Sequence, residues 1–463
     1  MAAETRTWWG ADILGRGAAS AVWARVPHEV TLGQLRERIT ERATALRARG
    51  AGRGSTVALC VPPGVTQVET LFAAWSLGAQ VILVDHRSSA GEFERVLSLC
   101  EPQYVLSPAA TPGKATAILA DEHHVRVERR VTGRSAESDI CLVQFSSGST
   151  GAPKAVGRSS GSLLAELDRY AALEGMPGRG ERLVLLNSLT HTMGLVGGLL
   201  HALNAGVELV FPARINPADV LQSAAETGAH AIFGVPVHFD LLSRRRHRKP
   251  PALRLAVSAG EMLPQEVYDR FADAFGTTIR PVYGTTETGL VAADLAGGCA
   301  PPCVGTPTRD MRVRELAGEL HVALERSPYL YTEQHGRYDD GWLRTFDRCV
   351  GEARTGHLHI LGRTDSVVVV GGLKVDLGEV EAVLRGHPSV REAVVVCDAT
   401  IEAYVGGDET LTADLLARWC RDRLSDFKIP RRFHLAAAVP RNPDGKIIRR
   451  PELLRMAFRT ANG

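Results

Sequence analysis

The sequence has no long hydrophobic run and almost no net charge. None of its 463 residues falls in an uninterrupted apolar run of about 18 or more, so we expect no membrane-spanning helix. The first residues, MAAETRTWWG, lack the apolar core of a signal peptide. The 54 basic and 52 acidic residues nearly cancel, which disfavours a partner attracted by charge alone. These absences predict a cytoplasmic protein with neither nucleic acid nor membrane as a partner.

Cysteine pairs with metal-binding spacing are also scarce. Of the 8 cysteines, only Cys299 and Cys303 lie close together, in CAPPC, and no second pair accompanies them. We therefore expect reduced thiols and assign them neither a metal nor a disulfide. The Gly-Lys-Ser/Thr sequence of the common phosphate loop and the loops of protein kinases are absent as well. An ordinary NTPase or kinase is accordingly disfavoured.

Short apolar runs alternate with helix-like segments over the first two thirds of the chain. STVALCV (55–61) and QVILVD (80–85) predict buried strands, and VETLFAAWSLG (68–78) predicts the helix between them. Such alternation predicts an α/β fold of parallel sheets covered by helices on both faces. In these sheets ligands bind at the carboxyl ends of the strands, so chemistry is expected in the loops that follow strands.

The pattern changes after about Pro301. GELHVAL (318–324) and HLHILGR (357–363) predict strands with few helices between them, hence a small β-subdomain. Beyond Asp365 mixed strands and helices predict an α+β module of ordinary domain size. We place the boundary at GRTD, which gives an N-terminal domain of residues 1–363 and a mobile C-terminal domain of residues 364–463.

A loop suited to phosphate follows the apolar run ICLVQF. FSSGSTGAPK (145–154) combines hydroxyl groups, glycines whose backbone amides can converge on an anion, and the charge of Lys154. Ala152 and Pro153 separate Gly151 from that lysine, unlike in the common phosphate loop. A plain connection between strands has a similar composition, so this loop alone does not decide the function.

Three further segments carry polar groups at strand ends or turns. YGTTETG (283–289) sets hydroxyls beside Glu287, a hard oxygen ligand suited to Mg²⁺. Arg363 and Asp365 lie at the domain boundary, and Lys446 follows the turn-forming NPDG. Each has a plainer interpretation: a polar turn, a linker or a solvated surface lysine.

In this order and spacing the segments resemble the adenylate-forming superfamily of acyl- and aryl-CoA synthetases, peptide-synthetase adenylation domains and luciferases. The resemblance runs along essentially the whole chain and includes GEL (318–320) and DGWLRTFD (340–347). It implies an AMP-forming ligase that joins a carboxylate to ATP, giving an acyl-adenylate and pyrophosphate. A thiol then takes the acyl group.

The resemblance also assigns roles to residues. The loop that grips the β- and γ-phosphates comprises Ser146, Ser147, Gly148, Ser149, Thr150, Gly151 and Lys154. Further expected ATP-binding residues are Ser258, Gly260, Glu261, Tyr283, Gly284, Thr285, Asp347 and Arg363. Thr286 would contact the α-phosphate, Glu287 would hold Mg²⁺, and Lys446 would neutralise charge as the carboxylate attacks. His191 completes the expected catalytic set, near the carboxylate.

Family members use one site for both half-reactions by rotating the small domain. The resemblance makes Asp365 the hinge and places Gly371 and Gly372 beside the thiol tunnel; a tight hairpin turn explains the two glycines equally well. The usual Thr-Gly-Asp of the ribose site is here Thr345-Phe346-Asp347, which leaves the loop conformation open. The usual Thr-His after the phosphate loop is Ser159-Ser160.

The acid is expected to be an aryl or short acyl acid. NSLTHTMGLVGG (187–198) contains no aspartate to pair with a substrate ammonium, which disfavours an α-amino acid. A hydrogen-bonded core histidine is the alternative for His191. The expected pocket residues are His191, His238, Ser258, Tyr283, Gly284, Thr285, Gly289 and Leu290.

The acceptor stays open. We favour CoA; the alternatives are the phosphopantetheine of an acyl or aryl carrier protein, an amine, or activation of another oxyacid such as nitrite. The basic run RRRHRK (244–249) suits CoA phosphates or an acidic carrier surface, or is a solvated loop. A non-catalytic nucleotide-binding protein on the same fold is the competing class. The chain is expected to be a monomer or homodimer.

Overall fold

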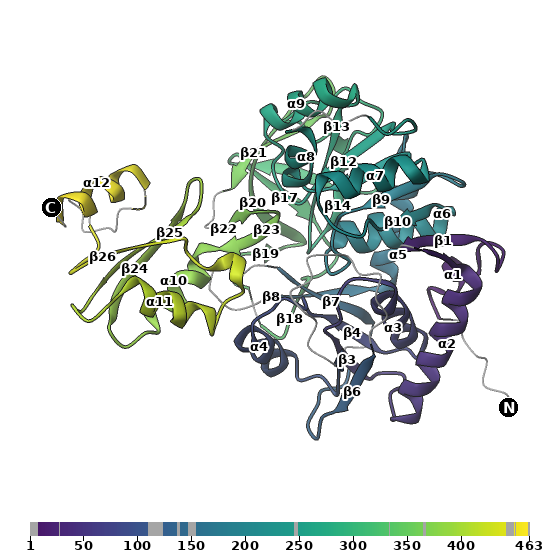
Figure 1. Cartoon of the computed structure of the whole chain (residues 1–463), viewed down its shortest axis with the longest axis horizontal. Helices are drawn as coiled ribbons and strands as arrows, with labels where there is room; N and C mark the ends of the chain where they lie inside the picture. The colour runs from purple at the N-terminus through teal and green to yellow at the C-terminus, as the bar shows by residue number, and fades with distance from the viewer. Residues whose placement is uncertain are drawn as a thin grey trace. The chain divides into compact units, whose positions relative to one another are not determined.

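A computed structural model provides the structure of the chain, and it describes residues 8–26, 28–109, 124–136, 139–146, 154–244, 249–332, 334–363, 367–440, 449 and 451–461. The chain forms two compact units. Unit 1 comprises residues 1–86, 100–145 and 155–362, and unit 2 comprises residues 87–99, 146–154 and 363–463. Figure 1 shows the helices and strands of both units with their labels.

The largest sheet of unit 1 is mostly parallel, as the alternating pattern predicts. Its order is β15-β14-β13-β12-β11-β9-β10-β1-β2. Its strands are β1 (Val22–Val26), β2 (His28–Thr31), β9 (Arg182–Leu185), β10 (Glu208–Val210), β11 (Ala231–Gly234), β12 (Leu255–Ala259), β13 (Ile279–Thr285), β14 (Gly289–Ala293) and β15 (Thr306–Pro307). Antiparallel pairing is confined to the two ends of the sheet, where hairpins close it.

A second sheet has the order β18-β8-β7-β4-β3-β5-β6. Its strands are β3 (Thr56–Leu59), β4 (Gln80–Leu83), β5 (Tyr104–Pro108), β6 (Val125–Arg129), β7 (Ile140–Ser146), β8 (Lys154–Ser159) and β18 (Tyr329–Leu330). β3 and β4 pair in parallel and every residue of both is buried, which explains why they read as continuous apolar runs in the sequence.

The helices of unit 1 alternate with its strands, as the pattern of apolar runs predicts. They are α1 (Ala11–Gly15), α2 (Leu32–Ala48), α3 (Val65–Ser76), α5 (Ser160–Ala172), η1 (Met193–Leu200), α6 (His201–Ala205), α7 (Pro217–Thr227), α8 (Pro236–Ser243) and α9 (Gln265–Phe275). In α2, Leu35 and Ile39 face the core, and Thr31 caps the helix by accepting a hydrogen bond from the Gln34 amide at 3.2 Å. The two strands and the one helix predicted at residues 55–85 are present as β3, α3 and β4.

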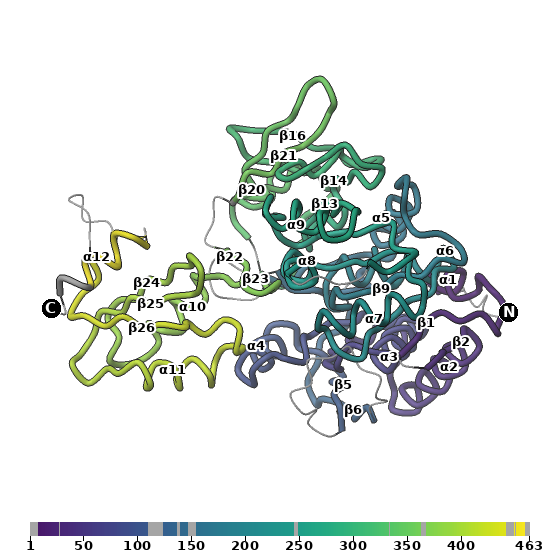
Figure 2. Tube along the Cα trace, turned by 45° about the horizontal axis from the view of Figure 1, so that its top comes forward, coloured from purple at the N-terminus to yellow at the C-terminus, as the bar shows by residue number. Residues whose placement is uncertain are grey.

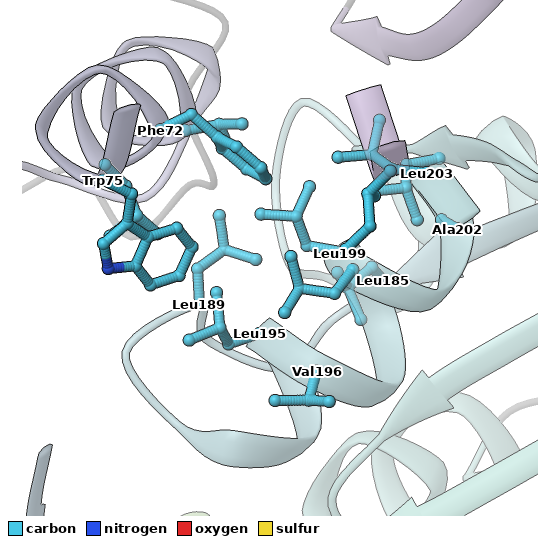
Figure 3. Packing of buried hydrophobic residues seen from close by; sticks show 14 of the residues in the cluster. Phe72, Trp75, Leu185, Leu189, Leu195, Val196, Leu199, Ala202 and Leu203 are labelled. Atoms are coloured by element: carbon cyan, nitrogen blue, oxygen red, sulfur yellow. The ribbon is translucent and has the colours of Figure 1, made fainter. Parts of the chain in front are cut away.

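The main core of unit 1 joins the two sheets through α3 and η1. Residues of both sheets and of both helices share one cluster of buried side chains. Figure 3 shows Phe72 and Trp75 of α3 near Leu195 and Leu199 of η1. η1 is a π-helix, and Gly197 and Gly198 leave room in it for Tyr170 and Leu185. Such π-segments are frequent near functional sites, and η1 begins within the predicted acid-pocket stretch, residues 187–198.

The predicted β-subdomain is a small antiparallel sheet of order β16-β17-β20-β19, with β21 paired to β20. Its strands are β16 (Val313–Leu316), β17 (Glu319–Ala323), β19 (Tyr338–Asp339), β20 (Trp342–Gly351) and β21 (Leu358–Arg363). Figure 2 shows β16, β20 and β21 in one group close to β13 and β14. Its core contains Ala292 of β14 beside Leu320 and Cys349, so the subdomain is anchored on the end of the main sheet.

Unit 2 contains the predicted α+β module together with two segments from earlier in the chain, residues 87–99 and 146–154. Its strands are β22 (Val367–Val370), β23 (Leu373–Asp376), β24 (Val390–Cys397), β25 (Ile401–Gly407) and β26 (Arg432–Ala436). Its helices are α10 (Leu377–Arg385), α11 (Ala413–Arg421), the short 3₁₀ helix η2 (Asp426–Lys428) and α12 (Pro451–Ala461). The first of these segments contains α4 (Ala90–Cys100) except for its last residue, and Lys428 binds Glu92 of this helix at 2.6 Å and also Glu379 at 3.0 Å.

One expectation about cysteine is wrong. Cys299 and Cys303 form a disulfide, with their Cα atoms 5.4 Å apart. A tight turn explains the pairing, because the Cys303 amide donates to the Ala300 carbonyl at 2.9 Å and folds the two ends of CAPPC together. The other cysteines are unpaired in the structure. As expected from the sequence, no helix within the described part of the chain is long and apolar enough to cross a membrane.

Candidate active site

Several polar strand ends meet at one edge of the main sheet. In β11, β12 and β13 the register places Gly234 beside Ser258, and Ser258 beside Pro281. The segments that follow these strands therefore begin side by side: the one that starts α8, the segment SAGE (258–261), and YGTTETG (283–289). Because all three strands run in parallel, these are carboxyl ends, where ligands bind in such sheets.

YGTTETG forms the tight hairpin between β13 and β14. The hydroxyls of Thr285 and Thr288 lie 3.0 Å apart, and each accepts the backbone amide of the other residue at 3.3 Å. These bonds close the turn and leave Glu287 at its tip, with only 6% of the residue exposed. A buried carboxylate must be compensated by donors or cations, so its neighbours matter.

Two side chains contact Glu287, one from β18 and one from the segment just before β19. The Tyr329 hydroxyl donates to Glu287 Oε1 at 3.1 Å, and Arg337 Nε donates to the Tyr329 hydroxyl at 3.0 Å. Arg337 Nη2 itself lies 3.6 Å from Glu287 Oε1. Burial and the Glu287 charge raise the pKa of Tyr329, so its hydroxyl keeps the proton it donates. Arg337 is 8% exposed, and its Nη1 has no hydrogen-bond partner among the described residues.

Asp347 is the second buried carboxylate, and it is oriented by β13. The Tyr283 hydroxyl donates to Asp347 Oδ2 at 2.6 Å. The Asp347 amide donates to Thr345 Oγ1 at 3.0 Å, and the Thr345 hydroxyl donates to the Leu320 carbonyl at 2.6 Å. β13 thus carries Tyr283, which holds Asp347, and the turn that follows β13 carries Glu287. The arrangement offers an acceptor pair for a diol on a rigid support.

The replacement of the usual glycine by Phe346 leaves a left-handed backbone in place. Phe346 has φ +62°, the region that glycine adopts without strain. The guanidinium groups of Arg337 and Arg344 lie 4.5 and 4.9 Å from the centre of its ring. Glu319 fixes the turn, since its Oε1 accepts the Phe346 amide at 3.1 Å while its Oε2 binds Arg344 at 2.7 Å. Cation–π contacts and the carboxylate offset the cost of the conformation.

The SAGE segment continues the floor of the site. Ser258 is 2% exposed, and its hydroxyl has no hydrogen-bond partner among the described residues. Gly260 has φ +90°, so glycine suits the turn that carries the chain away from the sheet. A buried hydroxyl without a protein partner is suited to bind a polar group of a ligand.

A buried ion pair supports the hairpin from behind. Arg158 Nη2 lies 2.8 Å from Glu166 Oε2, and both side chains are almost completely buried. Glu166 Oε1 accepts the Leu290 amide at 3.0 Å. Gly289, with φ +67°, lies so close to Glu166 that any side chain there would collide with the carboxylate. These contacts fix the backbone of two predicted pocket residues, Gly289 and Leu290.

The two predicted pocket histidines have different surroundings. His191 is exposed, which argues against a core histidine, and its loop is held by Gln144, whose Nε2 donates to the Thr190 carbonyl at 2.8 Å. His238 Nδ1 accepts the Val235 amide at 3.2 Å and so caps α8. Burial lowers the pKa of His238 to about 4, so its ring is neutral near pH 7.

The remaining predicted residues lie in unit 2 or outside the described residues. Ser147, Gly148, Ser149, Thr150, Gly151, Asp365 and Lys446 lie outside them, as does the side chain of Arg363. Ser146 ends β7, and Lys154, 3% exposed, begins β8. Gly371 and Gly372 form a two-residue hairpin loop between β22 and β23 with φ +57° and +86°. The plain hairpin is therefore present, whatever further role the glycines have.

The sequence interpretation missed two contributors to the site. Tyr329 and Arg337 reach Glu287 from a segment that shows no motif, and no local signal in SPYLYTEQHGRYDD could have found them. Both ends of the basic run have partners outside any ligand site. Arg244 binds Asp240 at 2.6 Å, and Lys249 donates to the Thr277 hydroxyl at 2.9 Å; residues 245–248 lie outside the described ones.

The carboxyl ends of parallel strands thus carry buried Glu287 and the Ser258 hydroxyl, which has no partner among the described residues, and Tyr283 holds a second buried carboxylate, Asp347, beside them. This arrangement is typical of an α/β enzyme that binds a polar ligand at its sheet edge. Residues 15–320 match the AMP-binding enzyme family, and residues 379–446 match the C-terminal domain of AMP-binding enzymes. The chain belongs to this family. It is an AMP-forming ligase with the adenylate-forming activity of acyl- and aryl-CoA ligases.

Known relatives extend over nearly the whole chain. The 4-chlorobenzoate–CoA ligase of Arthrobacter sp. is 27% identical over 484 aligned positions, which cover 94% of this chain and 91% of the relative. The o-succinylbenzoate CoA synthetase of Bacillus subtilis has a solved structure with a TM-score of 0.83 and 22% identity, covering 97% of this chain and 98% of that one. The amide bond synthetase McbA of Marinactinospora thermotolerans has a TM-score of 0.81 and 22% identity, with coverage of 97% and 99%. Both structures confirm the fold.

Proposed function

We propose that the chain activates an aryl or short acyl carboxylic acid with ATP and transfers the acyl group to the thiol of CoA. The observation that carries this is a pair of buried carboxylates positioned by the β13–β14 hairpin. Tyr283 of β13 donates to Asp347 at 2.6 Å, and four residues later Glu287 lies at the tip of the hairpin. The first would take the ribose hydroxyls and the second Mg²⁺ and phosphate, which matches the resemblance found in the sequence.

The residues around Glu287 fit a magnesium–phosphate group. Carboxylate and hydroxyl oxygens are the hard donors that Mg²⁺ accepts, and the ion usually shares its coordination with substrate phosphates. When bound, Mg²⁺ would neutralise charge on the phosphates. Arg337, buried beside Glu287 and with one nitrogen unpartnered among the described residues, adds a fixed positive charge to the same region.

The first half-reaction is an in-line displacement at the α-phosphorus. A carboxylate oxygen of the acid forms a bond to phosphorus, and the bond to the bridging oxygen breaks, so that pyrophosphate leaves with the electron pair. We assign the α-phosphate contact to Thr286, the β- and γ-phosphates to the loop Ser146–Lys154, and charge neutralisation to Lys446. Ser258, Gly260 and Glu261 would form the adenine and acid floor.

The second half-reaction transfers the acyl group. The thiolate of CoA attacks the acyl carbon, the carbon–oxygen bond to AMP breaks, and AMP leaves with that electron pair. We propose that the C-terminal domain, residues 364–463, pivots at Asp365 and exchanges Lys446 for the hairpin of Gly371 and Gly372. Arg363 is assigned to the ribose side of the N-terminal domain, residues 1–363.

The acid pocket is proposed on one face of the same sheet edge. Its members are His191, His238, Ser258, Tyr283, Gly284, Thr285, Gly289 and Leu290. An aryl acid is supported by the similarity to the 4-chlorobenzoate–CoA ligase, which extends over 94% of this chain. The alternatives to CoA as the acceptor are a carrier-protein pantetheine and an amine, and the alternative to a carboxylic acid is another oxyacid. The following experiment tests each of them.

ATP–pyrophosphate exchange, measured with aryl, short-chain, long-chain and amino acids and with nitrite, tests the first half-reaction without an acceptor. We expect exchange with an aryl or short acyl acid, and thioester formation on addition of CoA. Exchange with amino acids alone would contradict the pocket assignment. Product formed only with a carrier protein or an amine would contradict CoA as the acceptor.

Lys446→Ala separates the two half-reactions. We expect adenylate formation to fall at least about a thousandfold, because an in-line displacement loses its charge neutralisation, while preformed acyl-adenylate still reacts with CoA. Lys249→Ala, which removes a lysine whose ammonium donates to the Thr277 hydroxyl, is the matched control. Equal loss in both half-reactions would contradict the role assigned to Lys446.

A further inference from the structure

A cluster of metal-binding side chains lies apart from the residues assigned to catalysis. The sulfur atoms of Cys299 and Cys303 and a ring nitrogen of His357 all lie within 4.8 Å of one another. Cys299 and Cys303 are 3% and 4% exposed, and His357 is partly exposed. Two sulfurs and one imidazole are the ligand types that zinc prefers.

Two short segments far apart in the sequence build this cluster. The first is the turn 294–303, in which Asp294 accepts the amides of Gly297 at 2.9 Å and Cys299 at 3.1 Å. The second is the start of β21. The Val304 amide donates to the Leu358 carbonyl at 2.8 Å, which fixes the end of the turn beside His357. The three ligands are thus placed by hydrogen bonds of backbone amides to the Asp294 carboxylate and to the Leu358 carbonyl, none of which involves the disulfide.

The dimensions suit a tetrahedral ion. With zinc–sulfur bonds of about 2.3 Å, two thiolates on one ion lie about 3.8 Å apart, so the sulfurs must separate once the disulfide is reduced, while the His357 ring nitrogen already lies within 4.8 Å of both. The Cα atoms of the two cysteines are 5.4 Å apart, so side-chain rotation alone can open the sulfurs to that separation. The Glu352 carboxylate lies 4.0 Å from His357 Nδ1. A histidine that binds a metal through one ring nitrogen usually has a carboxylate or carbonyl partner at the other, and Glu352 is placed for that role.

We propose that Cys299, Cys303 and His357 form a zinc site when their disulfide is reduced. A dithiol reductant gives two electrons and two protons to the Cys299–Cys303 bond and becomes a disulfide itself. The two thiols then bind Zn²⁺ as thiolates and release their two protons, while His357 binds through a neutral ring nitrogen. The fourth position is left to water. The ion ties the 294–303 turn to β21, the last strand before the predicted domain boundary.

The test uses the whole chain and Co²⁺, a coloured substitute for Zn²⁺. The protein is reduced with a phosphine, freed of it without oxygen, and titrated with Co²⁺. We expect a thiolate-to-cobalt charge-transfer band that saturates at one ion per chain and disappears when Zn²⁺ is added. Cys299→Ser and Cys303→Ser should each abolish the band, and His357→Ala should weaken binding at least tenfold.

A matched control replaces a cysteine outside the cluster. Cys141 is half-buried and unpaired, so Cys141→Ser should keep the full band. The proposal fails if reduced wild-type protein gives no band, or if the band survives in Cys299→Ser. Since the wild-type titration alone can give the first of these results, the test does not depend on the variants folding. It also needs no catalytic activity, so it is independent of the proposed function.

Discussion

Arg337 Nη2 lies 3.6 Å from Glu287 Oε1, and both side chains are buried. Glu287 is the carboxylate proposed to hold Mg²⁺. The guanidinium of Arg337 compensates its buried charge and also helps to hold it in position. Tyr329 bridges the two groups, so the carboxylate is oriented by a short network rather than by one bond. The network links the β13–β14 hairpin to the segment before β19. We expect its loss to lower the rate of adenylate formation.

Arg337→Met should lower the rate of ATP–pyrophosphate exchange by about tenfold to a hundredfold, because a misplaced Glu287 no longer positions the phosphates. Exchange rates at saturating ATP and Mg²⁺ measure the effect. Arg314→Met is the matched control: Arg314 is an exposed arginine stacked on Trp342 at 4.1 Å. Equal losses in the two variants would show that the effect is not specific to the network.

Tyr283→Phe removes the 2.6 Å hydrogen bond to Asp347 and leaves the ring in place. We expect the KM for ATP to rise roughly tenfold, equivalent to about 1.5 kcal/mol for one bond to a charged acceptor, with kcat changed little. Tyr338→Phe, which loses a bond to the Leu324 carbonyl, is the control. A fall in kcat with an unchanged KM would contradict a positioning role for Tyr283.

Phe346→Gly and Phe346→Ala distinguish backbone strain from ring packing. Both variants lose the contacts with Arg337 and Arg344, but only glycine adopts φ +62° without a steric penalty. The glycine variant should therefore be the more stable of the two by about 1 kcal/mol, measured by denaturant unfolding. An alanine variant as stable as the glycine variant would show that the backbone is not held in the left-handed region.

His238 should make stability depend on pH. Its pKa is lowered by burial from 6.5 to about 4 in the folded chain, whereas the unfolded chain binds a proton below pH 6.5. Between these values the unfolded state holds more protons, so the free energy of unfolding falls as pH drops from 6.5 to 4, by at most about 3 kcal/mol. His238→Gln keeps an acceptor for the Val235 amide and should flatten the profile, as measured by unfolding at several pH values.

The fold was largely predictable because the apolar pattern is strong. Buried parallel strands such as β3 and β4 and helices such as α2 leave periodic signals that depend on neighbouring residues alone. The pairing of Cys299 with Cys303 was missed, since spacing does not show whether a turn folds two thiols together. The assignment of Lys446 and Asp365 as catalytic lysine and hinge stays a prediction.

The sequence by itself determined the α/β fold and, through ordered motifs, the adenylate-forming family. It identified Glu287 and Asp347 because each lies in a motif of adjacent residues. Only the tertiary structure decided which side chains hold them: Tyr329 and Arg337 approach Glu287 from 42 positions or more along the chain, and Tyr283 approaches Asp347 from 64. Local patterns record the preferences of neighbouring residues, whereas contacts between distant segments follow from strand order and register.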